Sequence, residues 1–210
     1  MILSKPAAVH VSLRVTSHVW SLRGLRCFRV IEGSFAEARG RFGLRIIEFS
    51  VMDKHLHLFV EADDDLALSR GIQGLRLRIT RELNRVMGRR GAVFADRHHA
   101  RVLGSPNEYV TAMADLLGSA AQQYGAEGAE AFSSAAYDNQ KRERVLSSAR
   151  TWLLIAGWRR RMPVELQAIS GFAAGSPTAT SPPPSPSTLT TTSRITSTIP
   201  SGPAPRSRAA

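Results

Sequence analysis

Apolar and polar residues alternate along several short stretches of the chain. Residues 9–15 carry apolar side chains at every second position, which predicts a half-buried first strand. Residues 44–51 and 56–61 predict two more strands, joined by a turn at residues 52–54. We expect a fourth strand at residues 93–103.

A second pattern, with apolar residues three and four positions apart, predicts the helices. It is clearest from residue 68 to residue 86, and we expect further helical segments at residues 31–42, 108–123 and 142–160. The apolar stripe of the clearest helix consists of Leu68, Ile72, Leu75, Ile79, Leu83 and Val86.

The predicted order of elements is β-α-β-β-α-β, which is typical of an α+β fold. It favours a ferredoxin-like or RRM-like antiparallel sheet with helices on one face. We place this domain at residues 8–161. Residues 162–210 are rich in Ser, Thr and Pro, and eight of the eleven prolines follow residue 171. Such a segment buries too little apolar surface to offset its ordering entropy, so we expect a disordered tail.

The charge of the chain points to a polyanionic partner. There are 28 Lys and Arg residues against 17 Asp and Glu, a formal net charge of +11, and most of the basic residues are Arg. The arginine fork matches phosphate groups, so the excess favours nucleic acid. A coding bias that replaces Lys by Arg without any ligand is the alternative explanation.

Cysteine content and hydropathy exclude other classes of protein. The lone Cys27 excludes an intrachain disulfide framework and a cysteine-based zinc site. No apolar run approaches the length of about 20 residues that spans a bilayer. We therefore expect a cytoplasmic protein without a membrane partner.

His55 and His57 are the candidate metal ligands. They are separated by one residue within a predicted strand, so their side chains point to the same face about 7 Å apart. Neutral imidazole is a common metal ligand, and two histidines leave coordination positions open for water or phosphate. The alternative is a pair of strand histidines without a ligand.

The segment Asp53-Lys54-His55-Leu56-His57-Leu58 resembles the motif of the HUH nuclease superfamily. The chain is similar to its single-tyrosine transposases, in the branch that includes the REP-associated tyrosine transposases of bacteria. Four further segments carry this resemblance in the family's order: Val9-His-Val-Ser-Leu-Arg-Val15, Leu68-Ser-Arg-Gly-Ile-Gln-Gly-Leu75, Gly91-Ala-Val-Phe-Ala-Asp-Arg-His-His-Ala-Arg-Val-Leu103 and Thr151-Trp-Leu-Leu-Ile-Ala-Gly-Trp-Arg-Arg160.

The resemblance implies a fold, a cofactor and a reaction. It implies that the histidine pair lies on a middle strand and holds Mg²⁺ or Mn²⁺ against a scissile phosphate in single-stranded or hairpin DNA. It also implies that a tyrosine from a later helix attacks that phosphate, leaving a 5′-phosphotyrosine link that conserves the bond for rejoining. We expect the protein to act on DNA either as a monomer or as a homodimer.

The chain departs from the family pattern at the nucleophile. When Ala114-Asp-Leu-Leu-Gly-Ser119 is laid on that pattern, Asp115 takes the tyrosine position and Ser119 the position of a polar metal-shell residue. Tyr109 and Tyr124 share the predicted helix but point away from Asp115 at 100° per residue. Asp115 is then either a third metal ligand or a mark of decay in a degenerate transposase.

Several basic residues are candidates for contact with nucleic acid. Arg78, Arg81 and Arg85 project from the clearest helix opposite its apolar stripe, although such a face is often just solvated. The other candidates are Arg97 and His99, in the family's Arg-aromatic-His motif, and Arg159 and Arg160.

We thus expect a transposase-like protein that nicks and rejoins DNA if it is active. The alternatives are a catalytically dead single-stranded nucleic-acid-binding module of the same fold, and a structural domain whose basic surface has no specific partner.

Overall fold

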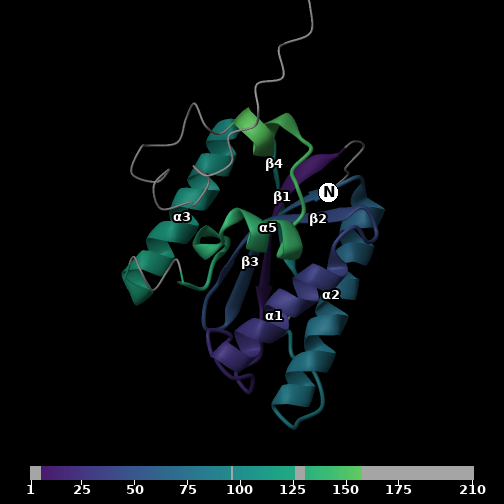
Figure 1. Ribbon diagram of the computed structural model, residues 1–210, viewed down its shortest axis with the longest axis vertical. Coiled ribbons are helices and arrows are strands. Elements are labelled where there is room, and N and C mark those ends of the chain that lie inside the picture. The colour runs from purple at the N-terminus through teal and green to yellow at the C-terminus, as the bar shows by residue number, and fades with distance from the viewer. Residues whose placement is uncertain (1–5, 96, 126–130, 158–210) are drawn as a thin grey trace, which may run out of the picture. The chain divides into compact units, whose positions relative to one another are not determined.

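The computed structural model describes residues 6–95, 97–125 and 131–157. Four strands form one antiparallel sheet in the order β2-β3-β1-β4 (Figure 1). With a helix after β1 and another after β3, this is the ferredoxin-like α+β arrangement that the sequence predicts. The strands are β1 (Ala7–Arg14), β2 (Leu44–Val51), β3 (His55–Ala62) and β4 (His99–Leu103).

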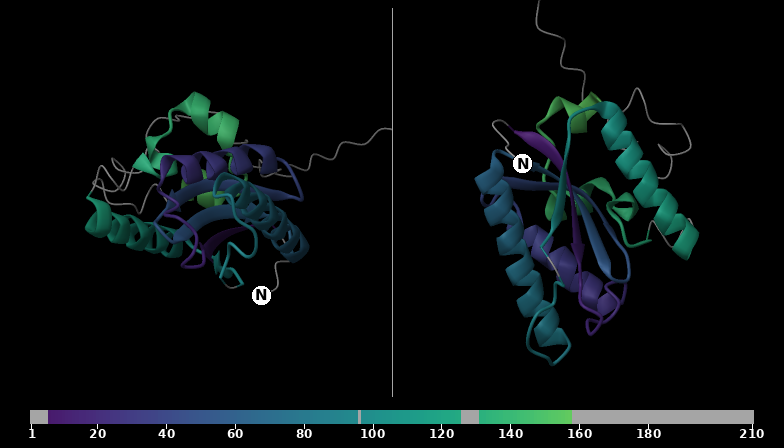
Figure 2. Two further views of the ribbon diagram at one scale, coloured as in Figure 1. Left: turned by 90° about the horizontal axis from the view of Figure 1, so that it is seen from below. Right: turned by 180° about the vertical axis from the view of Figure 1, so that it is seen from behind.

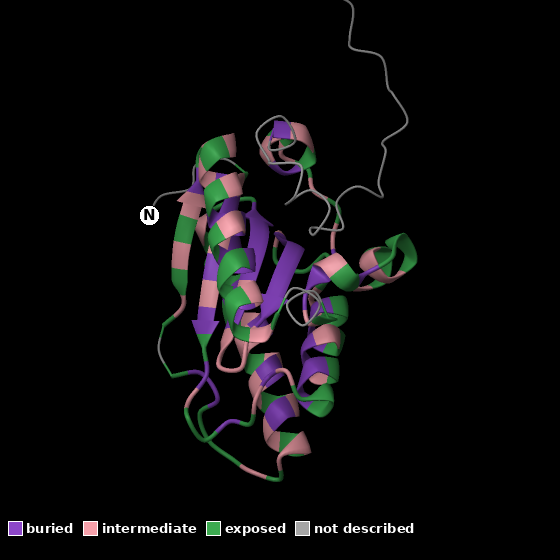
Figure 3. Ribbon diagram, turned by 90° about the vertical axis from the view of Figure 1, so that its left-hand side faces the viewer, coloured by how far each residue is buried: buried purple, intermediate pink, exposed green. Residues whose placement is uncertain are grey.

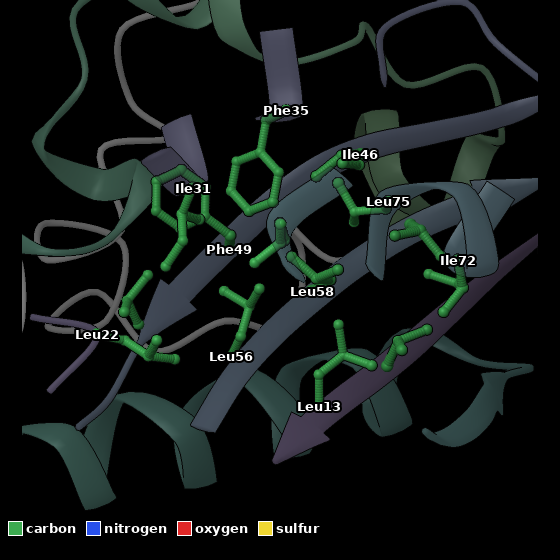
Figure 4. Close-up of a cluster of buried hydrophobic side chains, with 14 of the residues drawn as sticks. Leu13, Leu22, Ile31, Phe35, Ile46, Phe49, Leu56, Leu58, Ile72 and Leu75 are labelled. Carbon is green, nitrogen blue, oxygen red and sulfur yellow. The ribbon is translucent and has the colours of Figure 1, made fainter. Parts of the chain in front are cut away.

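The helices α1 (Leu25–Ala38) and α2 (Asp65–Val86) cover one face of the sheet (Figure 2). Asp64 begins α2, because its carboxylate accepts the backbone N–H of Ala67. Alternate residues of the strands are buried against both helices, and Figure 4 shows them in contact. The largest fully buried side chains of this core include Leu13, Ile31, Phe35, Leu56, Leu58, Ile72 and Leu75.

The helix α3 (Pro106–Tyr124) packs on the other face of the sheet (Figure 2). Ser105 caps its first turn by accepting the N–H of Glu108, and proline occupies the first helical position. A second, smaller core forms between this helix and the sheet from Ala8, Ile47, Phe59, Leu103, Tyr109, Ala112, Met113, Leu116, Leu117 and Leu154. The single layer of helices that we expected is therefore correct for α1 and α2, and α3 adds a helix on the opposite side.

Two buried carboxylates of the sheet hold the residues after α3 in place. Glu48 accepts hydrogen bonds from Ser134 and Arg142. Glu61 accepts the backbone N–H groups of Arg150 and Thr151. These contacts position the short elements η1 (Ser134–Ala136), α5 (Asn139–Val145) and η2 (Leu153–Gly157).

Two predicted elements are shorter than expected. The fourth strand begins at His99 instead of residue 93, because the described residues just before it pair with the sheet only through a bridge between Phe94 and Val15. Residues 142–160 are no continuous helix, since α5 ends at Val145 and a separate turn follows. The predicted tail lies outside the described residues.

The colours of Figure 3 show burial along each element: β2 and β3 are largely purple and the helices are striped. In the part of the chain that the structure describes, no helix is long and apolar enough to cross a membrane.

Candidate functional site

His55 and His57 lie on the face of the sheet that α3 covers. Their neighbours Leu56 and Leu58 point into the opposite core, so alternation along β3 directs both imidazoles toward α3. Their ring centroids are 6.2 Å apart. His57 is paired in register with Ser12 of β1 and Ser50 of β2, so small side chains flank it on both sides.

A third histidine belongs to this cluster. His10 on β1 places its Nε2 atom 3.2 Å from Nδ1 of His57. Its ring also stacks on Phe59, with centroids 4.9 Å apart. His10 cannot be recognised as a site residue from the local sequence, because its position beside His57 depends on the pairing of two strands that are distant in sequence.

The environment keeps His10 and His57 neutral. Burial, followed by the nearby His10 and His55, lowers the pKa of His57 to about 4. Burial and the positive charge of Arg101 lower the pKa of His10. The neutral imidazole is the form that binds metals, so His57 is in the form that can bind a cation at neutral pH.

The histidines line an open pocket of about 520 Å³ between the sheet and α3. Asp115 and Ser119 line the same pocket from α3, one helical turn apart, and both are exposed. Arg101 lines it from β4. The structure thus brings the predicted residues His55, His57 and Asp115 to one cavity, and it adds His10 and Arg101.

The two ends of α3 fix its direction along β3. Near the beginning, Tyr109 is fully buried and its ring meets Phe59 edge-on at 5.2 Å. At the end, the hydroxyl of Tyr124 accepts the backbone N–H of Asp53, in the turn before β3, over 3.1 Å. Between these anchors, the helix presents Asp115 to the pocket.

None of the three tyrosines of the chain lines the pocket as the structure describes it. Burial raises the pKa of the Tyr109 phenol well above its usual value. The guanidinium carbon of Arg23 lies over the Tyr124 ring, 3.8 Å from the centroid of that ring. Tyr137 is hydrogen-bonded to Glu32, and burial raises its pKa. The phenols therefore serve packing and hydrogen bonding away from the histidines.

The donors around the pocket suit a divalent cation, although the described residues contain no group of three or more His, Cys, Asp or Glu side chains arranged to hold one. The imidazoles of His55 and His57 would supply two protein ligands, and the remaining positions would fall to water and a phosphate oxygen. Mn²⁺ accepts imidazole and carboxylate ligands together, whereas Mg²⁺ prefers oxygen. The donor set therefore fits Mn²⁺ better than Mg²⁺.

The predicted arginine face of α2 is partly engaged within the protein. Arg78 forms an ion pair with Glu37 of α1, and Arg85 binds Glu82 over 2.7 Å. Arg81 is exposed and pairs with no described acidic residue.

Arg97 and His99 are both exposed near the start of β4. His99 is paired with Ser12 and so lies on the face of the histidine cluster, but Arg101, two residues later, is the basic residue that reaches the pocket. Arg159 and Arg160 lie outside the described residues.

Comparison with known proteins places this arrangement in a family. A family described as "Transposase IS200 like" matches residues 10–111, which include the three histidines and end four residues before Asp115. No curated protein matches the chain.

Solved structures of two transposases are similar to it. One is a REP-associated tyrosine transposase bound to a REP hairpin, with 10% identity, a TM-score of 0.49, and coverage of 72% of this chain and 90% of that one. The other is a candidate transposase from Deinococcus radiodurans, with 11% identity, a TM-score of 0.41, and coverage of 51% and 86%. By the family match, residues 10–111 of this chain form an IS200-like transposase domain.

Proposed function

We propose that this protein binds single-stranded or hairpin DNA at the pocket under α3, and that it does so without forming a covalent tyrosyl intermediate. The observation that carries the proposal is the composition of the pocket. It contains His10, His55, His57, Asp115 and Arg101, whereas the hydroxyls of all three tyrosines lie elsewhere.

The residues of the pocket have distinct roles in this proposal. His55 and His57 would hold a divalent cation, which would neutralise charge on a phosphate group of the DNA. Arg101 would contact the same or a neighbouring phosphate from β4. Asp115 carries a carboxylate and cannot supply the phenolic oxygen on which rejoining depends.

A second candidate function is metal-dependent hydrolysis of DNA. The position of Asp115 in the pocket of the histidine pair favours it, because a carboxylate there can orient a water molecule or accept its proton. Hydrolysis would nick the strand without conserving the bond, so the broken ends could not be rejoined.

A binding and nicking assay tests both functions. A labelled hairpin with single-stranded flanks is titrated with protein at moderate salt, with Mn²⁺ or with a chelator, and the products are separated under denaturing conditions. We expect the protein to bind the hairpin more tightly than plain duplex DNA and to form no covalent link to it. A nicked product without adduct would support hydrolysis. An adduct mapped to Tyr109, Tyr124 or Tyr137 would overturn the proposal, and so would absence of any preference for the hairpin.

A further inference from the structure

A groove on the far side of the sheet from the histidine pocket carries an exposed aromatic ring among arginines. It lies between α2 and the loop that precedes β2, and its volume is about 300 Å³, at the lower end of the range of small-molecule pockets. Leu44 and Leu75 contribute buried apolar surface. Phe42, Arg41 and Arg81 contribute exposed side chains at its rim.

The backbone of Phe42 is strained. Its φ angle is 58°, a left-handed conformation that a bulky side chain rarely adopts. The side chain is 58% exposed, and one edge of the ring lies over Gly74 of α2. Most of the ring therefore faces solvent in a conformation that glycine would adopt more easily. Such strain at an exposed aromatic residue points to a role in binding.

The charges at the groove favour an anionic ligand. Glu82 lines it but is bound by Arg85, and Arg78 is bound by Glu37. Within the described residues, Arg41 and Arg81 have no acidic partner. Two guanidinium groups are thus available beside an exposed ring.

We infer that this groove binds an unpaired nucleotide of a single strand, with the base stacked on Phe42 and the flanking phosphates on Arg41 and Arg81. Sites for single-stranded nucleic acid combine these two elements, a stacking platform and a positively charged rim. An apolar peptide would use the ring but would leave both arginines without partners. The inference rests on the proposed DNA-binding function and adds a second contact site for the strand.

Cross-linking locates the base directly. A single-stranded oligothymidylate of about eight nucleotides, within the usual site size, is substituted with 5-iodouracil, irradiated with the protein, and the linked peptide is identified by mass spectrometry. We expect a cross-link at Phe42. Cross-links confined to other residues, with binding intact, would overturn the nucleotide site and leave the proposed function standing. Absence of any binding would instead overturn the proposed function.

Two substitutions at Phe42 separate binding from folding. Phe42→Leu keeps an apolar side chain but removes the stacking face, and we expect about tenfold weaker binding. Phe42→Gly also relieves the backbone strain, so the thermal midpoint should stay equal or rise while affinity falls. Trp20→Leu is the matched control, because Trp20 is another exposed aromatic residue that does not line the groove. Unchanged affinity in both Phe42 variants would overturn the inference.

The arginines give an independent measurement. Arg81→Ala should reduce the slope of log affinity for oligothymidylate against log salt concentration by about one, the value expected for the loss of one phosphate contact. Arg29→Ala, at an exposed position of α1 outside the groove, should leave the salt dependence unchanged. Equal salt slopes for the wild type, Arg81→Ala and Arg29→Ala would contradict a phosphate contact at Arg81. If sedimentation shows self-association that Phe42→Leu abolishes while DNA binding is unaffected, the groove joins two copies of the chain and the inference is wrong.

Discussion

The Nε2 atom of His10 lies 3.2 Å from the Nδ1 atom of His57, across the pairing of β1 with β3. One of these nitrogens must donate and the other accept, so the contact couples the tautomers of the two rings. If Nδ1 of His57 carries the proton, its Nε2 atom keeps a lone pair for a cation. His10 then acts as a positioning residue for a metal ligand.

The first prediction concerns this contact. His10→Ala should weaken Mn²⁺ binding about tenfold to hundredfold, because His57 loses the partner that orients its ring. His10→Gln keeps a side chain that can hydrogen-bond and should restore part of the affinity. Isothermal titration calorimetry with Mn²⁺ measures both. Equal affinity in wild type and His10→Ala would show that His57 needs no such partner.

The second prediction concerns the two proposed ligands. The double substitution His55→Ala and His57→Ala should abolish the heat of Mn²⁺ binding while leaving the circular dichroism unchanged, since both side chains face the pocket and not the main core. His18→Ala is the control, because His18 is exposed and lies outside the pocket. Undiminished Mn²⁺ binding by the double variant would place the cation elsewhere.

The third prediction follows from the pKa of His57, which folding lowers to about 4 from an ordinary value near 6.5. Between these values the unfolded chain binds more protons than the folded one, so stability falls as pH falls through this window. The full shift corresponds to about 3 kcal/mol.

Urea unfolding between about pH 7.5 and pH 4.5 measures this loss. His57→Gln should flatten the pH dependence of the free energy of unfolding over the same window, since Gln does not titrate. A curve for His57→Gln that parallels the wild-type curve would assign the loss to other groups.

The sequence predicts the fold well where each element follows from local periodicity. The stripe from Leu68 to Val86 identifies α2, and the alternation around His55 and His57 places both rings on one face. It fails at β4, because Val93, Phe94 and Ala95 are apolar but make only one bridge to the sheet. Strand pairing decides that difference, and periodicity carries no information about pairing.

The site is predictable to the same extent. His55 and His57 stand in one short motif, whereas His10 and Arg101 join them only through the order β3-β1-β4. His10 is paired with Phe59 on β3 and with Arg101 on β4. These pairings follow from the register of the whole sheet, and no short segment of the sequence predicts them.

The fourth prediction concerns Glu61, which is fully buried and accepts bonds from Arg45 and from the backbone of Arg150 and Thr151. Glu61→Ala removes the acceptor of two backbone N–H groups and one of the two acidic partners of the buried Arg45, and it should lower the free energy of unfolding by about 3 kcal/mol. The exposed Glu143→Ala should change it by less than about 0.5 kcal/mol. Chemical denaturation compares the variants, and equal effects would remove the anchoring role of Glu61.

The last prediction concerns Asp115, which lines the histidine pocket and which we expect from the sequence resemblance to take the place of the family's tyrosine. The native protein should form no covalent adduct with DNA, because a carboxylate lacks the phenolic nucleophile. Asp115→Tyr restores that group on the same helical turn and should yield an adduct that needs a divalent ion. The adduct should disappear when His57→Ala is added. Denaturing electrophoresis of labelled hairpin DNA, followed by peptide mapping, measures all three proteins. If Asp115→Tyr binds the hairpin but yields no adduct, position 115 does not present its side chain to the scissile phosphate, and the protein only binds or hydrolyses DNA.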